Sequence, residues 1–162
     1  MNDQGTFRNF MESKKKHPQA AGVIPLSTRT GKILLCKRAK GQDHAGTWCG
    51  FGGMMEAGES PEEAALRELR EEAGIPETKV SLLKSGVYLK GELRFHQFVG
   101  LVDFPDTWKP SPGKGHKWEV ADAAWVPPED ARKLGELHPG LDAVLRKEGE
   151  RLERLDRRPH GE

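Results

Sequence analysis

The sequence predicts a single domain of the α/β or α+β class. Its 162 residues correspond to one ordinary domain, in which 1–18 form a polar lead-in and 19–158 form the folded unit. Apolar runs typical of strands are interspersed with a few helical segments, an arrangement typical of mixed folds. The mean hydropathy of −0.71 is low, but the apolar residues cluster in runs, so the composition is not that of a disordered chain.

Two apolar segments near the N-terminus, 20–26 and 32–38, predict a pair of strands. The residues between them, 27–31, are turn-forming, so we expect a β-hairpin. The next segment, 39–53, is rich in glycine. We expect it to be a loop that contains one short strand around Trp48.

Side chains mark both ends of one helix. Ser60 is suited to cap the helix N-terminus, Pro61 fits the first helical position, and Glu63 completes a capping box. The helix is expected to continue to about Ala73, because Gly74 is a typical C-terminal stop.

The second half of the chain predicts further strands and two helices. The segments 79–90 and 93–104 are apolar-rich and separated by a glycine, and 118–128 starts as another strand. A short helix is expected after Pro127. A longer one is expected from His138 onward, with leucine and valine residues at helical spacing.

The charge and the apolar content of the sequence argue against some classes of binding partner and some cellular locations. The formal net charge is +1, so no overall field would attract duplex nucleic acid or a membrane surface, and neither is expected as a partner. No apolar run has the length of a membrane span, and the N-terminus lacks the apolar core of a signal peptide, so a cytoplasmic location is expected. Cys36 and Cys49 fit no zinc-site spacing. Two reduced thiols are expected, with one disulfide as the alternative.

The helix predicted from Pro61 carries three closely spaced glutamates. Glu68, Glu71 and Glu72 lie at i, i+3 and i+4 and therefore share one face. Grouped carboxylates suit Mg²⁺ or Mn²⁺, which prefer hard oxygen ligands, and magnesium often bridges carboxylates to substrate phosphates. The alternative is a solvated acidic face without a ligand.

The residues around the glutamates favour the metal site. Gly52 and Gly53 stand before the helix, where a flexible backbone can bring a carbonyl or an amide next to a ligand. Arg67 lies beside the glutamates and can orient one of them through a charge-assisted hydrogen bond. An apolar face with the same spacing would hold the helix against a sheet, through Leu66, Leu69 and Ala73.

The stretch Gly53–Ile75 resembles the Nudix box, G-x5-E-x7-R-E-U-x-E-E-x-G-U, in which U is a bulky aliphatic residue. Every defined position is met, by Gly53, Glu59, Arg67, Glu68, Leu69, Glu71, Glu72, Gly74 and Ile75. Agreement by chance in a chain of this length is expected on the order of once in a million or less. The preceding Trp48–Gly53 segment resembles the lead-in of nucleotide-sanitising members such as the oxidised-purine triphosphatases. One departure is Met54, where many relatives have lysine.

The resemblance implies a fold and a set of site residues. The fold would be an α/β/α sandwich with a mixed central sheet, in which the box forms a loop–helix–loop. Mg²⁺, or Mn²⁺ in its place, would be held by Gly52, Glu68, Glu71, Glu72 and Glu119. Catalytic roles would fall to the same glutamates and to Arg67. Glu59 and Arg67 would fix the loop against the helix, and together with Gly53 they would support the metal ligands from outside the site.

The resemblance also implies hydrolysis of a nucleoside diphosphate linked to another moiety. The leading prediction is conversion of a nucleoside triphosphate to a monophosphate and pyrophosphate. The alternatives within the enzyme class are ADP-ribose or nucleotide sugars, dinucleoside polyphosphates, and the 5′ pyrophosphate of RNA. A non-catalytic nucleotide-binding module is disfavoured, because all the glutamates of the box are present. Which glutamate acts as the general base is left open.

Overall fold

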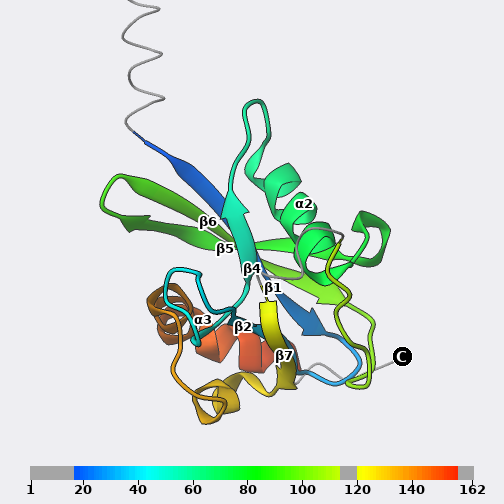
Figure 1. Ribbon diagram of the computed structural model, residues 1–162. Helices are drawn as coiled ribbons and strands as arrows, with labels where there is room; N and C mark the ends of the chain where they lie inside the picture. The colour runs from blue at the N-terminus through cyan, green and yellow to red at the C-terminus, as the bar shows by residue number, and fades with distance from the viewer. Residues whose placement is uncertain (1–16, 114–119, 157–162) are drawn as a thin grey trace, which may run out of the picture.

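The computed structural model describes residues 17–113 and 120–156 (Figure 1). Most of the predicted lead-in, 1–18, lies outside the described residues, and so does Glu119. Within the described part of the chain, no helix has the length and apolar character needed to cross a membrane.

Strand β1 (Gln19–Ser27) lies at the centre of the sheet. It runs parallel to β6 (Leu93–Val102) along its whole length. Its other edge is shared by β4 (Phe51–Met54) and β2 (Ile33–Arg38), both antiparallel to it. The predicted hairpin of β1 and β2 is therefore present, but the two strands pair at a single rung, since β4 occupies the other half of that edge.

The remaining strands extend this sheet in both directions. Strand β2 pairs with β3 (Trp48–Cys49) and with β7 (Val120–Val126), while β5 (Ser81–Lys90) pairs with β6. In the part of the chain that the structure describes, the result is a 7-stranded mixed sheet. The short strand predicted around Trp48 is confirmed as β3. The sequence does not predict the second strand, β4, which follows after Gly50; β3 pairs with β2, whereas β4 pairs with β1.

The helix α2 (Pro61–Ala73) begins and ends where the sequence predicts. The hydroxyl of Ser60 accepts a hydrogen bond from the Glu63 N–H at 3.1 Å. Gly74 adopts a φ of 73°, the left-handed conformation that favours glycine, and its N–H donates to the Arg70 carbonyl.

Three further helical segments follow within the described residues. They are a 3₁₀ turn η1 (Glu77–Lys79), a second 3₁₀ segment η2 (Pro128–Lys133), and the helix α3 (Pro139–Asp156). The short helix predicted after Pro127 is thus of the 3₁₀ type.

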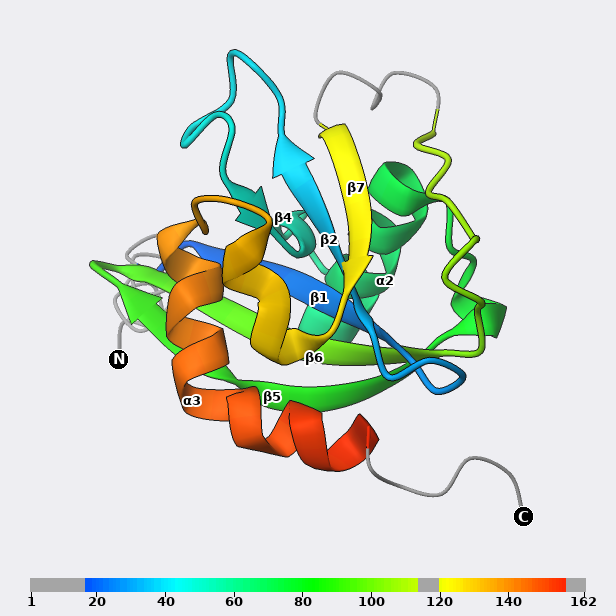
Figure 2. The same ribbon diagram turned by 90° about the horizontal axis from the view of Figure 1, so that it is seen from below.

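Helices α2 and α3 cover opposite faces of the sheet (Figure 2). Side chains alternate along a strand, so β1 sends Ala21 and Val23 into the core beneath α2, and Ile24 and Leu26 into the core beneath α3. Each core is closed by the apolar side of its helix. The α/β/α sandwich implied by the resemblance is confirmed.

Candidate active site

The acidic side of α2 lies beside two glycines of β4. A Cβ at Gly53 would stand 2.5 Å from Oε1 of Glu68 and 2.8 Å from its Cδ. A Cβ at Gly52 would stand 2.6 Å from the carbonyl oxygen of Ala21 in β1. All three distances are shorter than non-bonded contact allows, so glycine at these two positions lets α2, β4 and β1 approach this closely.

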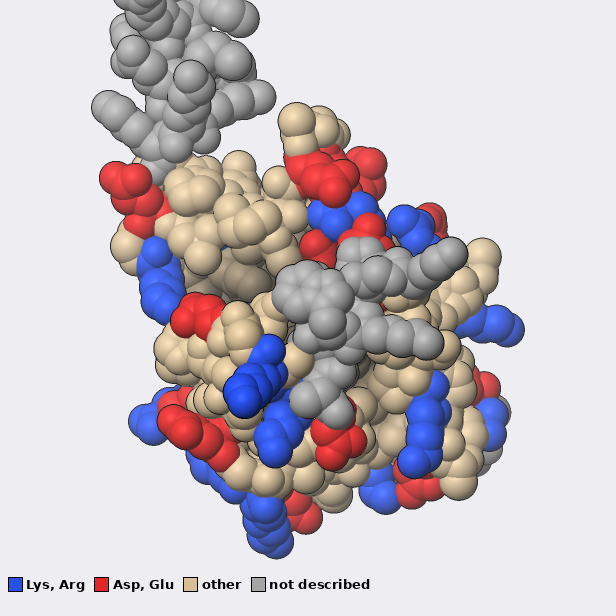
Figure 3. Space-filling view, viewed as in Figure 1, with Lys and Arg blue, Asp and Glu red and all other residues tan. Residues whose placement is uncertain are grey.

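Arg67 is the centre of the carboxylate cluster. Its Nε and Nη2 donate to the two carboxylate oxygens of Glu59, at 2.7 and 3.0 Å. Its Nη1 donates to Glu68 Oε1 at 3.0 Å and to Glu71 Oε2 at 3.2 Å. The guanidinium therefore links the β4–α2 loop to the acidic face of the helix, and Figure 3 shows acidic and basic side chains packed together over this loop.

The ion pairs that Arg67 makes with Glu59 and Glu68 are largely shielded from solvent. The side chains of Arg67, Glu59 and Glu68 are 14%, 15% and 12% exposed. The hydrogen bonds from Arg67, helped by one from the Glu56 N–H, lower the pKa of Glu59. The bond to Glu59 raises the pKa of Arg67. Both partners therefore remain ionised, and the bidentate geometry fixes their orientation.

Glu72 differs from the other two glutamates of the cluster. It is 7% exposed and lies on the sheet-facing side of α2, where its Oε1 accepts a hydrogen bond from the Gly52 N–H at 3.2 Å. The prediction that the three glutamates share one outward face is correct only in part. Glu72 lies three residues after Leu69 and seven after Ala65, so it belongs to the buried stripe. Leu66, predicted for that stripe, is only half-buried.

Two groups just before α2, one in the β4–α2 loop and one at the end of β4, reach the cluster although the sequence pattern does not mark them. Glu56 Oε1 lies 3.7 Å from Nη1 of Arg67, and the Met54 carbonyl accepts a hydrogen bond from Nη2 at 3.1 Å. The Glu56 N–H also donates to Oε1 of Glu59 at 2.7 Å. Gly58, with a φ of 83°, forms the turn that brings these residues together. Gly58 is the one feature of this stretch of sequence that indicates a turn, and therefore the contacts of Glu56 with Arg67 and Glu59.

The chemistry of the donor set fits a hard divalent cation. Three carboxylates project from adjacent turns of one helix beside the glycine backbone of β4, and oxygen ligands of this type suit Mg²⁺. In the described residues, no group of three or more Asp, Glu, His or Cys side chains is already gathered in metal-binding geometry, since Glu68 and Glu71 point to Arg67. Of the other predicted ligands, Gly52 contacts the cluster through its N–H, and Glu119 lies outside the described residues.

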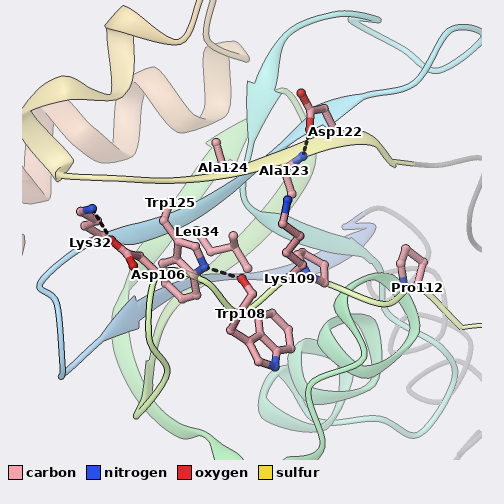
Figure 4. A pocket seen from close by; sticks show the side chains of 11 residues that line it. Lys32, Leu34, Asp106, Trp108, Lys109, Pro112, Asp122, Ala123, Ala124 and Trp125 are labelled. Atoms are coloured by element: carbon pink, nitrogen blue, oxygen red, sulfur yellow. Dashed lines mark hydrogen bonds and ion pairs between the residues drawn. The ribbon is translucent and has the colours of Figure 1, made fainter.

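A separate hollow of about 430 Å³ lies between β2, β7 and the loop that follows β6 (Figure 4). Trp108 and Trp125 form part of its wall, and the indole N–H of Trp125 donates to the Trp108 carbonyl at 2.8 Å. The ring of Trp108 stacks on Phe104 with centroids 4.6 Å apart. No residue of the box lines this hollow, so it is distinct from the carboxylate cluster.

The family model of the NUDIX domain matches residues 16–147 of this chain. The chain belongs to the Nudix family. Members of this family generally use divalent metals such as Mg²⁺. The matched residues include both the Nudix box and the strands of the central sheet.

Three curated Nudix relatives illustrate the range of similarity. A CTP pyrophosphohydrolase of Escherichia coli (strain K12) is 48% identical over 35% of this chain and 42% of its own length. An 8-oxo-dGTP diphosphatase of Proteus vulgaris is 41% identical over 45% of this chain and 63% of its own. Both of these matches span less than two thirds of the relative. The nucleoside triphosphatase NudI of Escherichia coli O139:H28 is 32% identical over 77% of this chain and 90% of its own.

A solved structure shares the fold. The Nudix hydrolase RenU of M. smegmatis superimposes with a TM-score of 0.66 at 25% sequence identity, covering 86% of this chain and 85% of its own. The arrangement of sheet and helices seen here is therefore that of the Nudix family.

Proposed function

We propose that this protein is a Mg²⁺-dependent hydrolase of nucleoside diphosphates linked to another moiety. Its preferred substrate would be a nucleoside triphosphate, which reacts with water to give a nucleoside monophosphate and pyrophosphate. The observation that carries the proposal is the cluster on α2, where Arg67 ties Glu59, Glu68 and Glu71 together and Glu72 is fixed against the Gly52 amide. A cytoplasmic location is part of the same proposal.

In this proposal the carboxylates of α2 hold the cation. Glu68, Glu71 and Glu72 would bind Mg²⁺, or Mn²⁺ in its place, with the Gly52 carbonyl and Glu119 as further ligands. When bound, the ion would neutralise charge on the diphosphate and lower the pKa of a water molecule. A carboxylate of the cluster would accept the proton of the attacking water.

Two features of the chain serve this chemistry directly. Arg67 holds the Glu68 and Glu71 carboxylates in place beside each other through hydrogen bonds. The Gly52 amide does the same for Glu72, which is also shielded from bulk water. Supporting residues of this kind are generally worth about 10- to 100-fold in metal affinity or activity.

The choice of a triphosphate rests on the relatives. The CTP pyrophosphohydrolase, the 8-oxo-dGTP diphosphatase and NudI are all named for nucleoside triphosphates. The segment Trp48–Gly53, which resembles the lead-in of nucleotide-sanitising members, supports the same class.

A substrate panel tests this proposal. Standard and oxidised nucleoside triphosphates, ADP-ribose, nucleotide sugars, dinucleoside polyphosphates and RNA with a 5′ triphosphate would each be incubated with Mg²⁺, and the products separated by chromatography. We expect preferential release of monophosphate and pyrophosphate from one triphosphate. Preference for any other member of the panel would overturn the substrate assignment, and no turnover of any of them would overturn the enzymatic role.

A further inference from the structure

The two cysteines of the chain lie directly opposite each other on neighbouring strands. Cys36 of β2 and Cys49 of β3 are paired in the antiparallel register, and their Sγ atoms are 3.7 Å apart. They are 13 residues apart in sequence, separated by the glycine-rich loop. We propose that Cys36 and Cys49 are a redox site, which forms a reversible intramolecular disulfide when the protein meets a peroxide.

The backbone already has the geometry that a disulfide requires. Opposed residues of an antiparallel pair have Cα atoms about 4.5 to 5.5 Å apart. Bridged cysteines have Cα atoms about 4.4 to 6.8 Å apart. The two sulfurs can therefore come into bonding distance by rotation of their side chains, without separating β2 from β3.

The two thiols differ in access and in acidity. Cys36 is 3% exposed, whereas Cys49 is half-buried. The hydrogen bond between the two thiols and the nearby Arg38 lower the pKa of Cys49. The same hydrogen bond raises the pKa of Cys36, and its burial and the charge of Glu72 act in the same direction. Cys49 is therefore the thiol that meets the oxidant first.

The chemical steps balance with a peroxide as oxidant. The Cys49 thiolate attacks one peroxide oxygen, the O–O bond breaks, and Cys49 becomes a sulfenic acid as hydroxide leaves and is protonated. The Cys36 sulfur then attacks the Cys49 sulfur and displaces the sulfenic oxygen as water. In total, two thiols and one hydrogen peroxide give one disulfide and two waters. A small dithiol reverses the reaction by exchange.

The two cysteines lie close to α2, so the disulfide would affect the surroundings of the proposed active site. Cys36 packs in the same core as Leu69 and Ala73 of α2, and lies within electrostatic reach of Glu72. Further oxidation of a lone thiol would place an anionic sulfinate or sulfonate next to this core. The partner thiol intercepts the sulfenic acid and leaves a neutral disulfide instead. This protective consequence rests on the proposed function, but formation of the disulfide does not.

Mass spectrometry of the full chain after hydrogen peroxide treatment tests the proposal. We expect both thiols of the wild type to become untitratable, and a digest to contain one cross-linked peptide pair joining Cys36 to Cys49. This pair should be about 2 Da lighter than the two reduced peptides together, a reading that is independent of methionine oxidation elsewhere in the chain. Dithiothreitol should restore both thiols. Cys36→Ser and Cys49→Ser are the matched variants, and their remaining thiol should instead gain oxygen atoms that dithiothreitol does not fully remove.

Several results would overturn the proposal. They are wild-type thiols that stay titratable, wild-type cysteine peptides that gain oxygen as those of the single variants do, or a disulfide found only between two chains. Circular dichroism would check the fold of the variants. Should buried Cys36→Ser not fold, the wild-type mass, thiol titration and peptide map decide the question alone. None of these readouts depends on turnover, so a failure here is distinct from a failure of the proposed hydrolase.

Discussion

Arg67 and Glu59 are joined by two parallel hydrogen bonds, Nε to Oε2 at 2.7 Å and Nη2 to Oε1 at 3.0 Å. Glu59 belongs to the loop before α2, and Arg67 to the second turn of the helix. The pair thus closes the loop onto the helix through side chains. The same guanidinium also holds Glu68 and Glu71, so the shape of the loop and the orientation of the proposed metal ligands are coupled.

Replacing Arg67 by lysine tests this coupling. Arg67→Lys keeps the charge but loses the planar fork that contacts Glu59 at two points. We expect turnover to fall by about 10- to 100-fold, with a raised Mg²⁺ requirement. Steady-state rates at several Mg²⁺ concentrations measure both. Arg70→Lys, at an exposed position of the same helix, is the control. Equal rates and equal Mg²⁺ requirements of Arg67→Lys and Arg70→Lys would mean that the two-point contact of the Arg67 guanidinium is not needed for activity.

The stability of the wild type relative to Glu59→Gln should depend on pH. Arg67 lowers the pKa of Glu59 in the folded protein, below the ordinary glutamate value of about 4.3. The carboxylate therefore stabilises the fold above that ordinary value, and this contribution is lost as the pH falls through the lowered pKa. Urea unfolding should show the wild type more stable at pH 7, with the difference vanishing in acid.

The matched control for Glu59 is Glu77→Gln, at an exposed position of η1. Its unfolding free energy should follow that of the wild type across the pH range. A difference between the wild type and Glu59→Gln that stays constant down to strongly acidic pH would contradict a role for the Glu59 charge.

Two neighbouring glycines should respond differently to alanine. At Gly53 the new methyl group would displace the Glu68 carboxylate, the end of a side chain that can rotate away. Gly53→Ala should therefore fold normally and lose activity. At Gly52 the methyl group would meet the backbone of β1, at Ala21, so Gly52→Ala should be destabilised by about 1 to 3 kcal/mol. Thermal melts and rates separate the two effects, and equal loss of stability in both variants would contradict them.

Glu72→Gln should retain the fold and lose activity. The amide oxygen of glutamine can still accept the hydrogen bond of the Gly52 N–H, but the charge that binds a cation is removed. We expect turnover at saturating Mg²⁺ to fall by about 100-fold or more, with an unchanged circular dichroism spectrum. Near-native turnover would remove Glu72 from the proposed set of ligands.

Features set by neighbouring residues could be predicted from the sequence. Ser60, Pro61 and Gly74 act on the first and last turns of α2, so both ends of the helix were predicted correctly. Strand pairing is different, because it depends on residues far apart in the chain. Nothing within β1 indicates that β6 is its parallel partner, or that the chain would switch partner strands at Gly50.

The candidate site, too, could be predicted only where it depends on the spacing of neighbouring residues. The spacing of Glu68, Glu71 and Glu72 predicts that they lie close together. In the structure Glu68 and Glu72 lie against β4, and Arg67 links Glu71 to Glu68. Spacing alone does not show where the sheet lies, so the burial of Glu72 could not be predicted. The contacts of Glu56 depend on a turn in a stretch where the box pattern defines no residue.

The most direct measurement is ³¹P NMR of a nucleoside triphosphate incubated with the wild-type protein and Mg²⁺, using the triphosphate that the panel shows to be turned over fastest. We expect monophosphate and pyrophosphate to appear in equal amounts, to be absent when the metal is chelated, and to form far more slowly with Glu72→Gln. Release of diphosphate and orthophosphate, or hydrolysis that continues without a divalent cation, would contradict the proposed reaction.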